Sequence, residues 1–128
     1  MRYLFDTQLL LLATFEAAAV PRRAVSLVDV PGTELFFSVA SLWEIAIKFG
    51  RGKPDFVVDP FPLRTALLRR GYAELPISGE HVMYCSRLPA IHKDPFDRLL
   101  VAQATIENIT LLTSDTMLAT YPGTVRKV

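Results

Sequence analysis

Cysteine, charge of one sign and long apolar runs are all scarce in this chain. The single cysteine, Cys85, excludes an intrachain disulfide and fits a reducing cytoplasm, where we interpret it as an inert core thiol. The apolar run Leu9–Leu12 is far shorter than the ~20 residues needed to cross a bilayer. Asp6 and Glu16 flank that run and argue against a secretory signal. We therefore expect a cytoplasmic protein that does not enter a membrane.

Several familiar site patterns are also missing. The 14 basic and 13 acidic residues nearly cancel, so nucleic-acid binding would have to come from a local arrangement, with an acidic centre and a basic rim. The segment 50–53 lacks the spacing of a phosphate-binding P-loop, and the chain has no Gly-x-Ser-x-Gly elbow. His81 and His92 do not have zinc-ligand spacing with each other or with Cys85. We interpret His92 as a surface histidine, although it lies two residues before Asp94.

The hydrophobic pattern predicts one α/β domain, residues 1–128. The hydrophobic content of 51% is enough to fill a core. Short apolar segments alternate with helical ones, which indicates a three-layer fold with a central, mostly parallel four- to five-stranded sheet flanked by helices. We expect strands at 2–6, 35–37, 72–75 and 109–112, with an edge strand at 124–127. We expect helices at 7–19, 21–29, 38–49, 59–70, 78–88, 94–107 and 114–120.

Five carboxylates lie at the junctions of these elements or within an apolar helix: Asp6, Glu44, Asp94, Asp97 and Asp115. Asp6 and Asp115 directly follow predicted strands, and parallel sheets bind ligands outside the carboxyl ends of their strands. Glu44 interrupts an apolar helix, where an unpaired buried charge would be very costly. Lys48, four residues later, could form an ion pair with it. We favour a metal-binding or active-site role for Glu44, with Lys48 nearby.

Each of the other acids also has a purely structural interpretation. Asp6 is a suitable N-cap, and Asp115 fits the first turn of a short helix. Asp94 before Pro95 is a strong N-cap, while Asp97 would gain from the helix dipole, so capping is favoured for Asp94 and the two roles are balanced for Asp97. Capping explains each residue alone, but not comfortably five of them at consecutive junctions. If the strands lie side by side, the acids form a hard-cation site suited to phosphodiester chemistry.

Four segments together resemble the PIN-domain ribonucleases, specifically the VapC-type toxins of prokaryotic toxin–antitoxin pairs. These segments are Leu4–Thr7, Ser38–Lys48, Leu88–Ala104 and Leu111–Asp115, of which Leu88–Ala104 is the most specific match. The resemblance spans nearly the whole chain in the right order, and it implies a PIN-like fold. It also implies cleavage of RNA, tRNA or rRNA in particular, that leaves a 5′-phosphate and a 3′-hydroxyl. A cognate antitoxin, a homodimer and a toxin–antitoxin hetero-oligomer are the implied partners.

By this resemblance the catalytic and metal-binding residues are Asp6, Glu44, Asp97 and Asp115, and the accessory residues are Asp94, Thr7 and Ser114. Their oxygen ligands suit Mg²⁺ or Mn²⁺. The expected phosphate-binding residues on the rim are Lys48, Lys93 and Arg98, although Arg98 could instead meet an antitoxin carboxylate. Arg51 and Lys53 are at least as well explained as ordinary solvated charges.

The sequence departs from the family pattern at three positions and leaves other functions open. Gln8, Leu12 and Lys93 stand where histidine, tryptophan and arginine are common, which affects substrate choice more than catalysis. A catalytically silent PIN-fold binding module is one alternative. A receiver-type Mg²⁺-binding signalling domain is another, although Asp6 is not one of a pair of acids and no late Lys-Pro is present. A haloacid-dehalogenase-type phosphatase would need an aspartate at position 8.

Overall fold

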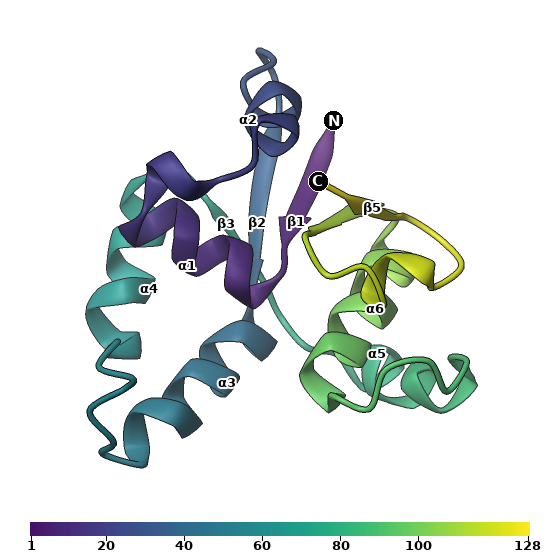
Figure 1. Ribbon diagram of the computed structural model, residues 1–128. Coiled ribbons are helices and arrows are strands. Elements are labelled where there is room, and N and C mark those ends of the chain that lie inside the picture. The colour runs from purple at the N-terminus through teal and green to yellow at the C-terminus, as the bar shows by residue number, and fades with distance from the viewer.

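Five short strands form one sheet in which every neighbouring pair is parallel (Figure 1). They are β1 (Arg2–Phe5), β2 (Glu34–Ser38), β3 (Ala73–Leu75), β4 (Thr110–Thr113) and β5 (Val125–Lys127). The computed structural model describes all residues from 1 to 128. The strand order β3-β2-β1-β4-β5 confirms the predicted α/β fold, including the edge strand at the end of the chain.

Six helices and three 3₁₀ turns connect the strands. The helices are α1 (Thr7–Phe15), α2 (Arg22–Val28), α3 (Val39–Gly50), α4 (Pro60–Arg69), α5 (Gly79–Tyr84) and α6 (Pro95–Glu107). The 3₁₀ turns are η1 (Ala17–Ala19), η2 (Cys85–Arg87) and η3 (Leu118–Thr120). The predicted helix 7–19 was too long, because Glu16 leaves the helical conformation with φ −139° and ψ 58°. The predicted helix at 114–120 is only the turn η3, and the one at 78–88 ends as η2.

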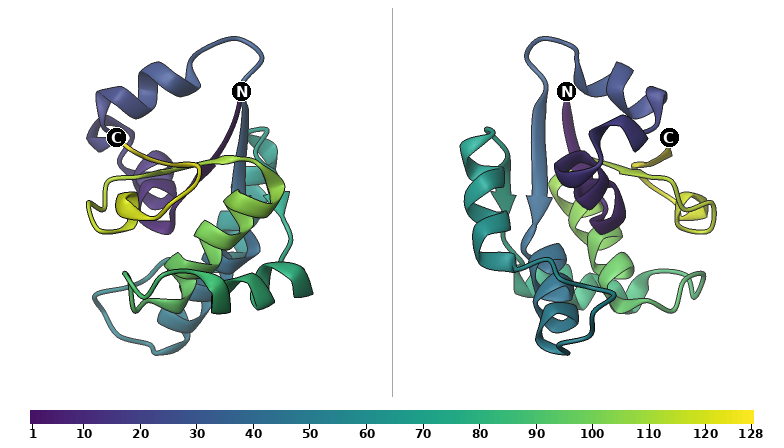
Figure 2. Two further views of the ribbon diagram at one scale, coloured as in Figure 1. Left: turned by 90° about the vertical axis from the view of Figure 1, so that its right-hand side faces the viewer. Right: turned by 60° about the vertical axis from the view of Figure 1, so that its left-hand side comes forward.

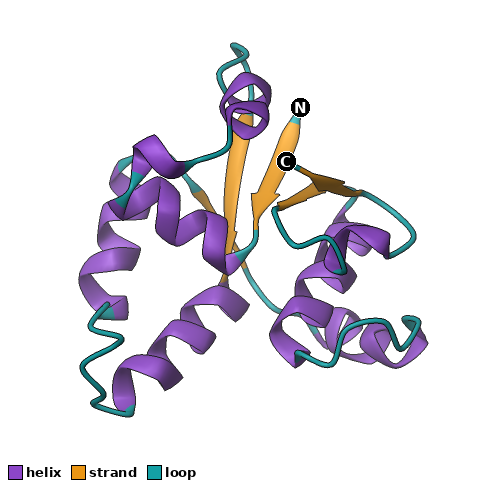
Figure 3. Ribbon diagram, viewed as in Figure 1, coloured by secondary structure: helices purple, strands orange, loops and turns teal.

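Helices cover both faces of the sheet (Figures 2 and 3), and an apolar cluster lies on each face. One layer packs α1, α2 and α4 on the sheet and includes Leu9, Ala24 and Leu67. The other packs α5 and α6 on the opposite face and includes Leu100 and Ala104. Cys85 is half-buried against this second layer, and burial raises the pKa of its thiol. No helix is long and apolar enough to span a membrane.

The starts of α3 and α6 follow from side-chain caps. The Ser38 hydroxyl accepts the amide of Ala40 at 2.9 Å, so Ser38 begins α3. The Ser38 hydroxyl also donates to Oε1 of the buried Gln103 on α6 at 2.5 Å. Asp94 begins α6 by accepting the amide of Phe96 at 2.8 Å, as predicted. These caps fix where the helices that carry Glu44 and Asp97 begin.

The strand order reverses between β1 and β4. From β1 the chain first adds strands on one side, through β2 and β3, and then on the other, through β4 and β5. Such a reversal is the usual ligand site of a parallel α/β sheet, because the connections diverge there. The order also differs from the 2-1-3-4-5 order of flavodoxin-like folds, which removes the receiver alternative.

Candidate metal centre

Asp6 lies at this reversal, directly after β1, and it is only 5% exposed. One carboxylate oxygen accepts the amide of Leu9 at 2.8 Å and caps α1. The other accepts the hydroxyl of Thr113, at the end of β4, at 2.5 Å. The capping interpretation of Asp6 is therefore correct, and the second oxygen links β1 to the end of the neighbouring strand.

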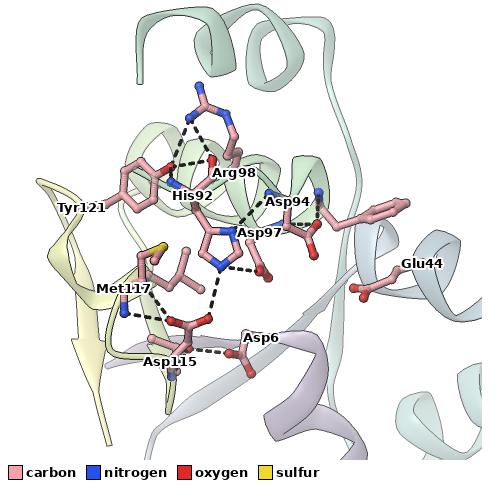
Figure 4. Close-up of polar contacts among 12 residues, drawn as sticks. Asp6, Glu44, His92, Asp94, Asp97, Arg98, Asp115, Met117 and Tyr121 are labelled. Carbon is pink, nitrogen blue, oxygen red and sulfur yellow. Dashed lines mark hydrogen bonds and ion pairs between the residues drawn. The ribbon is translucent and has the colours of Figure 1, made fainter. Parts of the chain in front are cut away.

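Asp115 follows β4 on the same edge of the sheet (Figure 4). Its Oδ1 accepts the amides of Met117 and Leu118 at 2.8 and 3.1 Å, and its own amide donates to the Thr113 hydroxyl at 3.0 Å. Its Oδ2 is 3.2 Å from Nε2 of His92. The Leu118 amide, with smaller contributions from His92 and the Met117 amide, lowers the pKa of Asp115. Asp115 is thus held as a carboxylate in one orientation.

Asp97 approaches from the first turn of α6. Its Oδ2 is 3.4 Å from Nε2 of His92, and its side chain is 19% exposed. Burial is the main cause that raises the pKa of Asp97 to about 7, followed by repulsion from Asp94. Asp6 and Glu44 raise this pKa further, while His92 lowers it. Asp97 therefore lies within the field of three other carboxylates.

Glu44 completes the acidic group from α3. It is buried, and its Oε2 accepts Nζ of Lys48 at 2.9 Å, so the expected ion pair is present. Repulsion from Glu44 and from Asp115 adds to burial, the largest cause, in raising the pKa of Asp6. Figure 4 shows the Glu44 carboxylate on the side of the cluster opposite Asp115. The structure thus brings Asp97 and Asp115 close together, with His92, while Asp6 and Glu44 lie outside that group and act on it through their charge.

His92 lies between two of these acids, and its interpretation as a surface histidine was wrong. Its side chain is 19% exposed, and its Nδ1 accepts the amide of Asp94 at 3.1 Å. The neutral ring therefore carries its proton on Nε2, the nitrogen that faces both Asp97 and Asp115. The nearness of His92 to Asp94 in sequence was the one signal that pointed to the site.

The loop that carries His92 is held by Arg98, one of the residues expected on the phosphate-binding rim. The guanidinium donates to the carbonyls of Cys85 and Pro89 at 2.7 and 2.9 Å, and to the Tyr121 hydroxyl at 3.1 Å. The same hydroxyl accepts the amide of His92 at 2.8 Å. In this arrangement Arg98 and Tyr121 position His92. Sequence reasoning missed both Tyr121 and Thr113.

The other expected residues lie around the centre rather than in it. Thr7 donates its hydroxyl to Ser41 at 2.9 Å within the core. Ser114 is exposed and makes no side-chain hydrogen bond. Lys93 is exposed beside an apolar cleft lined by Trp43 and Phe96, whose rings meet edge to face.

The donor set fits a divalent cation. One atom each from His92, Asp97 and Asp115 can be chosen so that all three lie within 4.8 Å of one another. Because the Asp94 amide occupies Nδ1 of His92 and Nε2 carries the proton, the two carboxylates would be the ligands of the ion and His92 would stand beside them. Carboxylate oxygens suit Mg²⁺ and Mn²⁺, and clustered carboxylates without a counter-ion repel each other, which is consistent with the raised pKa of Asp97. A cation at this point would relieve that repulsion.

Comparison with known proteins identifies the family of the chain. The family model of the PIN domain matches residues 3–123. The chain belongs to the PIN-domain family. A search of curated proteins finds no match for this PIN domain.

Solved structures with the same fold include toxin–antitoxin complexes. VapBC2 from Rickettsia felis, bound to a promoter DNA fragment, matches with a TM-score of 0.74 at 15% identity, covering 100% of this chain and 99% of that one. A toxin–antitoxin complex from Klebsiella pneumoniae matches with a TM-score of 0.64 at 18% identity, covering 97% and 95%. DNA-bound VapBC from Salmonella typhimurium matches with a TM-score of 0.65 at 13% identity, covering 99% and 98%. At these identities the likeness concerns the fold.

Proposed function

We propose that this PIN domain is a metal-dependent endoribonuclease and the toxin of a VapC-type toxin–antitoxin pair in the cytoplasm. One observation carries the proposal: Asp97 and Asp115, which are far apart in sequence, lie together with His92 at the reversal point of the sheet, near enough to Asp6 and Glu44 for these two acids to raise the pKa of Asp97. A silent binding module would have no need to keep Asp6 and Asp97 where neighbouring carboxylates raise their pKa. The membership of the PIN family and the toxin–antitoxin complexes among similar folds support the same function.

The residues divide the work of such a site. Asp97 and Asp115 would hold Mg²⁺ or Mn²⁺, with His92 beside them and with Asp6 and Glu44 close enough to add ligands or orient water. The bound ion supplies an activated water and neutralises charge on the phosphodiester. Thr113 fixes Asp6 and Asp115 against each other, and Lys48 compensates Glu44. Asp94 fixes the tautomer of His92 through its backbone amide.

A cognate antitoxin is the proposed regulator, and the surface offers an apolar site for it. A cleft of about 850 Å³ between α1 and α4 is lined by Leu11, Leu12, Phe15 and Val57, among others. Leu9 and Leu10 of the same run are fully buried instead. Trp43 is 56% exposed and lines a second cleft with Phe61, which is available to a second copy in the proposed homodimer. Exposed apolar patches of this kind are typical of protein interfaces.

The experiment is cleavage of a mixed tRNA and rRNA pool by purified protein without antitoxin. Each reaction is run with Mg²⁺ or Mn²⁺ and with EDTA, beside an Asp6→Asn control for contaminating nucleases. Discrete fragments with 5′-phosphates that require both the ion and Asp6 would support the proposal. Intact RNA in every lane, from folded protein, would favour the silent binding module.

A further inference from the structure

A second charged cluster lies on the opposite side of β4 from β1, between α2 and β5. A cleft of about 550 Å³ is lined there by seven residues, four of which are basic: Arg22, Arg23, Arg126 and Lys127. All four side chains are exposed, and none of them forms an ion pair or a side-chain hydrogen bond. No acidic side chain lines the cleft. The cluster is therefore a local concentration of positive charge without an acidic side chain beside it, in a chain whose net charge is only +1, and the α-carboxylate of Val128 offsets at most one of its four charges.

Four basic side chains elsewhere have partners, and the remaining unpartnered ones do not line a shared cleft of four basic residues. Lys48 and Arg64 pair with glutamates, and Arg2 and Arg98 donate to backbone carbonyls. The four basic residues of the cleft come from two segments about 100 positions apart in the sequence. The packing of α2 beside the edge strand β5 brings them together. Figure 2 shows the end of the chain beside α2 in both views. Like charges held together without partners repel each other, so an anion that bridges them would be favoured.

The basic cluster is connected through the sheet to the acidic centre, by which we mean Asp6, Glu44, Asp97 and Asp115. Lys127 pairs in register with Thr113, and the amide of Val128 donates to the Thr113 carbonyl at 2.9 Å. The hydroxyl of Thr113 in turn donates to Asp6. Because all strands are parallel, the end of β5 lies on the same edge of the sheet as the acidic centre. A polyanion that reached the carboxylates from this side would pass the cluster first.

We propose that the cleft between α2 and β5 binds the phosphate backbone of the RNA substrate and delivers the strand to the acidic centre; this rests on the proposed nuclease function. Arginine forks suit phosphate oxygens, and the Ser26 hydroxyl in the cleft adds a donor. Backbone contacts of this kind position the strand and carry no sequence information. The acidic centre alone would repel RNA, so a nearby basic cleft supplies the attraction that the overall charge does not.

The test is RNA binding in EDTA, where no cleavage takes place. The two cluster variants are Arg22→Gln/Arg23→Gln and Arg126→Gln/Lys127→Gln, and the matched control is Arg69→Gln/Arg87→Gln, which removes the same charge from exposed positions elsewhere. Binding of a labelled single-stranded RNA is followed by fluorescence anisotropy over a range of salt concentrations, and circular dichroism checks each fold. If one cluster variant fails to fold, the other still tests the surface.

Each cluster variant should weaken RNA binding about 25-fold at 0.1 M salt and reduce the salt slope by about 1.4, as expected for two lost phosphate contacts on a single strand. The control should bind like the wild type. Equal weakening in the control and cluster variants, or no RNA binding by the wild type, would overturn the proposal. Binding of a labelled oligo-glutamate peptide is measured in parallel. If the cluster variants lost affinity for this peptide but kept the RNA affinity of the wild type, the surface would serve an acidic protein partner, and the proposal would be overturned. Loss of RNA binding in both cluster variants would support an RNA-binding role of the cleft whether or not the wild type cuts RNA. The binding role is therefore tested separately from the nuclease function.

Discussion

Folding favours the protonated form of Asp97, whereas the proposed metal binding needs its carboxylate. Its pKa in the folded protein is raised to about 7, above its usual value of 3.8. Between these values the folded protein keeps a proton that the unfolded chain releases. The associated stabilisation is complete below about pH 4 and is lost as the pH rises through about 7. Ionising this site for metal binding thus weakens the metal-free fold.

Asp97→Asn should abolish the fall in unfolding free energy that accompanies the ionisation of Asp97. In EDTA at pH 8, we expect the unfolding free energy of the variant to be about 1–4 kcal/mol higher than that of the wild type. Near pH 4 the two values should be alike. Urea unfolding at the two pH values measures both. Asp55→Asn, on an exposed loop, is the control and should follow the wild type. An unchanged pH dependence in Asp97→Asn would show that Asp97 has no raised pKa.

His92 should set the pH range of metal binding. Its ring lowers the pKa of both Asp97 and Asp115, and metal binding needs both as carboxylates. We expect His92→Ala to move the midpoint of Mn²⁺ binding upward by about 1 pH unit, as measured by calorimetry between pH 6 and 8. His92→Gln, which can keep an N–H donor, should shift it less. A midpoint that stays in place in His92→Ala would contradict this role.

At the scale of elements, the end of β4 joins the two halves of the site through one hydroxyl. Thr113 is buried, donates to Asp6 and accepts the amide of Asp115. Thr113→Val would leave both groups without this partner, and unpaired buried polar groups are costly. We expect a loss of about 1–3 kcal/mol of unfolding free energy at pH 8, with a further rise in the pKa of Asp6 because this hydrogen bond lowers it.

The matched control for this change is Thr110→Val on the same strand. Thr110 is half-buried and makes no side-chain hydrogen bond, so its replacement should cost much less. Urea unfolding of the two variants side by side measures the difference. Equal destabilisation would mean that the hydrogen bonds of Thr113 contribute nothing beyond packing.

Local signals predicted most elements because the residues that start them are chemically distinctive. Asp94 before Pro95 places the start of α6, and the short apolar runs place β1 and β4 to within a residue or two. The break after Phe15 could not be predicted in this way. Glu16 and Ala17–Ala19 are compatible with a helix, and the chain leaves it there to reach α2 on the sheet. Residues 14–19 contain neither proline nor glycine, the usual local signals for the end of a helix.

At the scale of the whole molecule, the sequence predicted that the acids lie at one edge of the sheet, but not that His92 lies between Asp97 and Asp115 or what holds these residues in place. Asp6 and Asp115 could be placed together because both follow strands of a parallel sheet. The roles of His92 and Arg98 could not, because they depend on where the loop before α6 meets Tyr121, 23 residues beyond Arg98. Contacts between residues so far apart in the chain produce no periodic pattern and no fixed local spacing, so the sequence alone does not reveal them.

Metal binding should stabilise the whole protein, because the ion favours the folded state in which the acids are together. At 100 times its dissociation constant, Mn²⁺ or Mg²⁺ should add about 2.7 kcal/mol and raise the melting temperature by about 10 °C for a domain of this size. Thermal melts at pH 8 with the ion and with EDTA measure the shift.

The informative variant for these melts is again Asp97→Asn. Its metal-free melting temperature should exceed that of the wild type, yet the ion should raise it little, because the carboxylate that weakens the empty site also binds the cation. Asp55→Asn should keep the full shift. Equal melting temperatures of the wild type with the ion and with EDTA, over the millimolar range, would contradict a preformed site. If Asp97→Asn melts at a higher temperature than the wild type without metal, and the ion no longer raises its melting temperature, then the same carboxylate destabilises the metal-free protein and binds the cation.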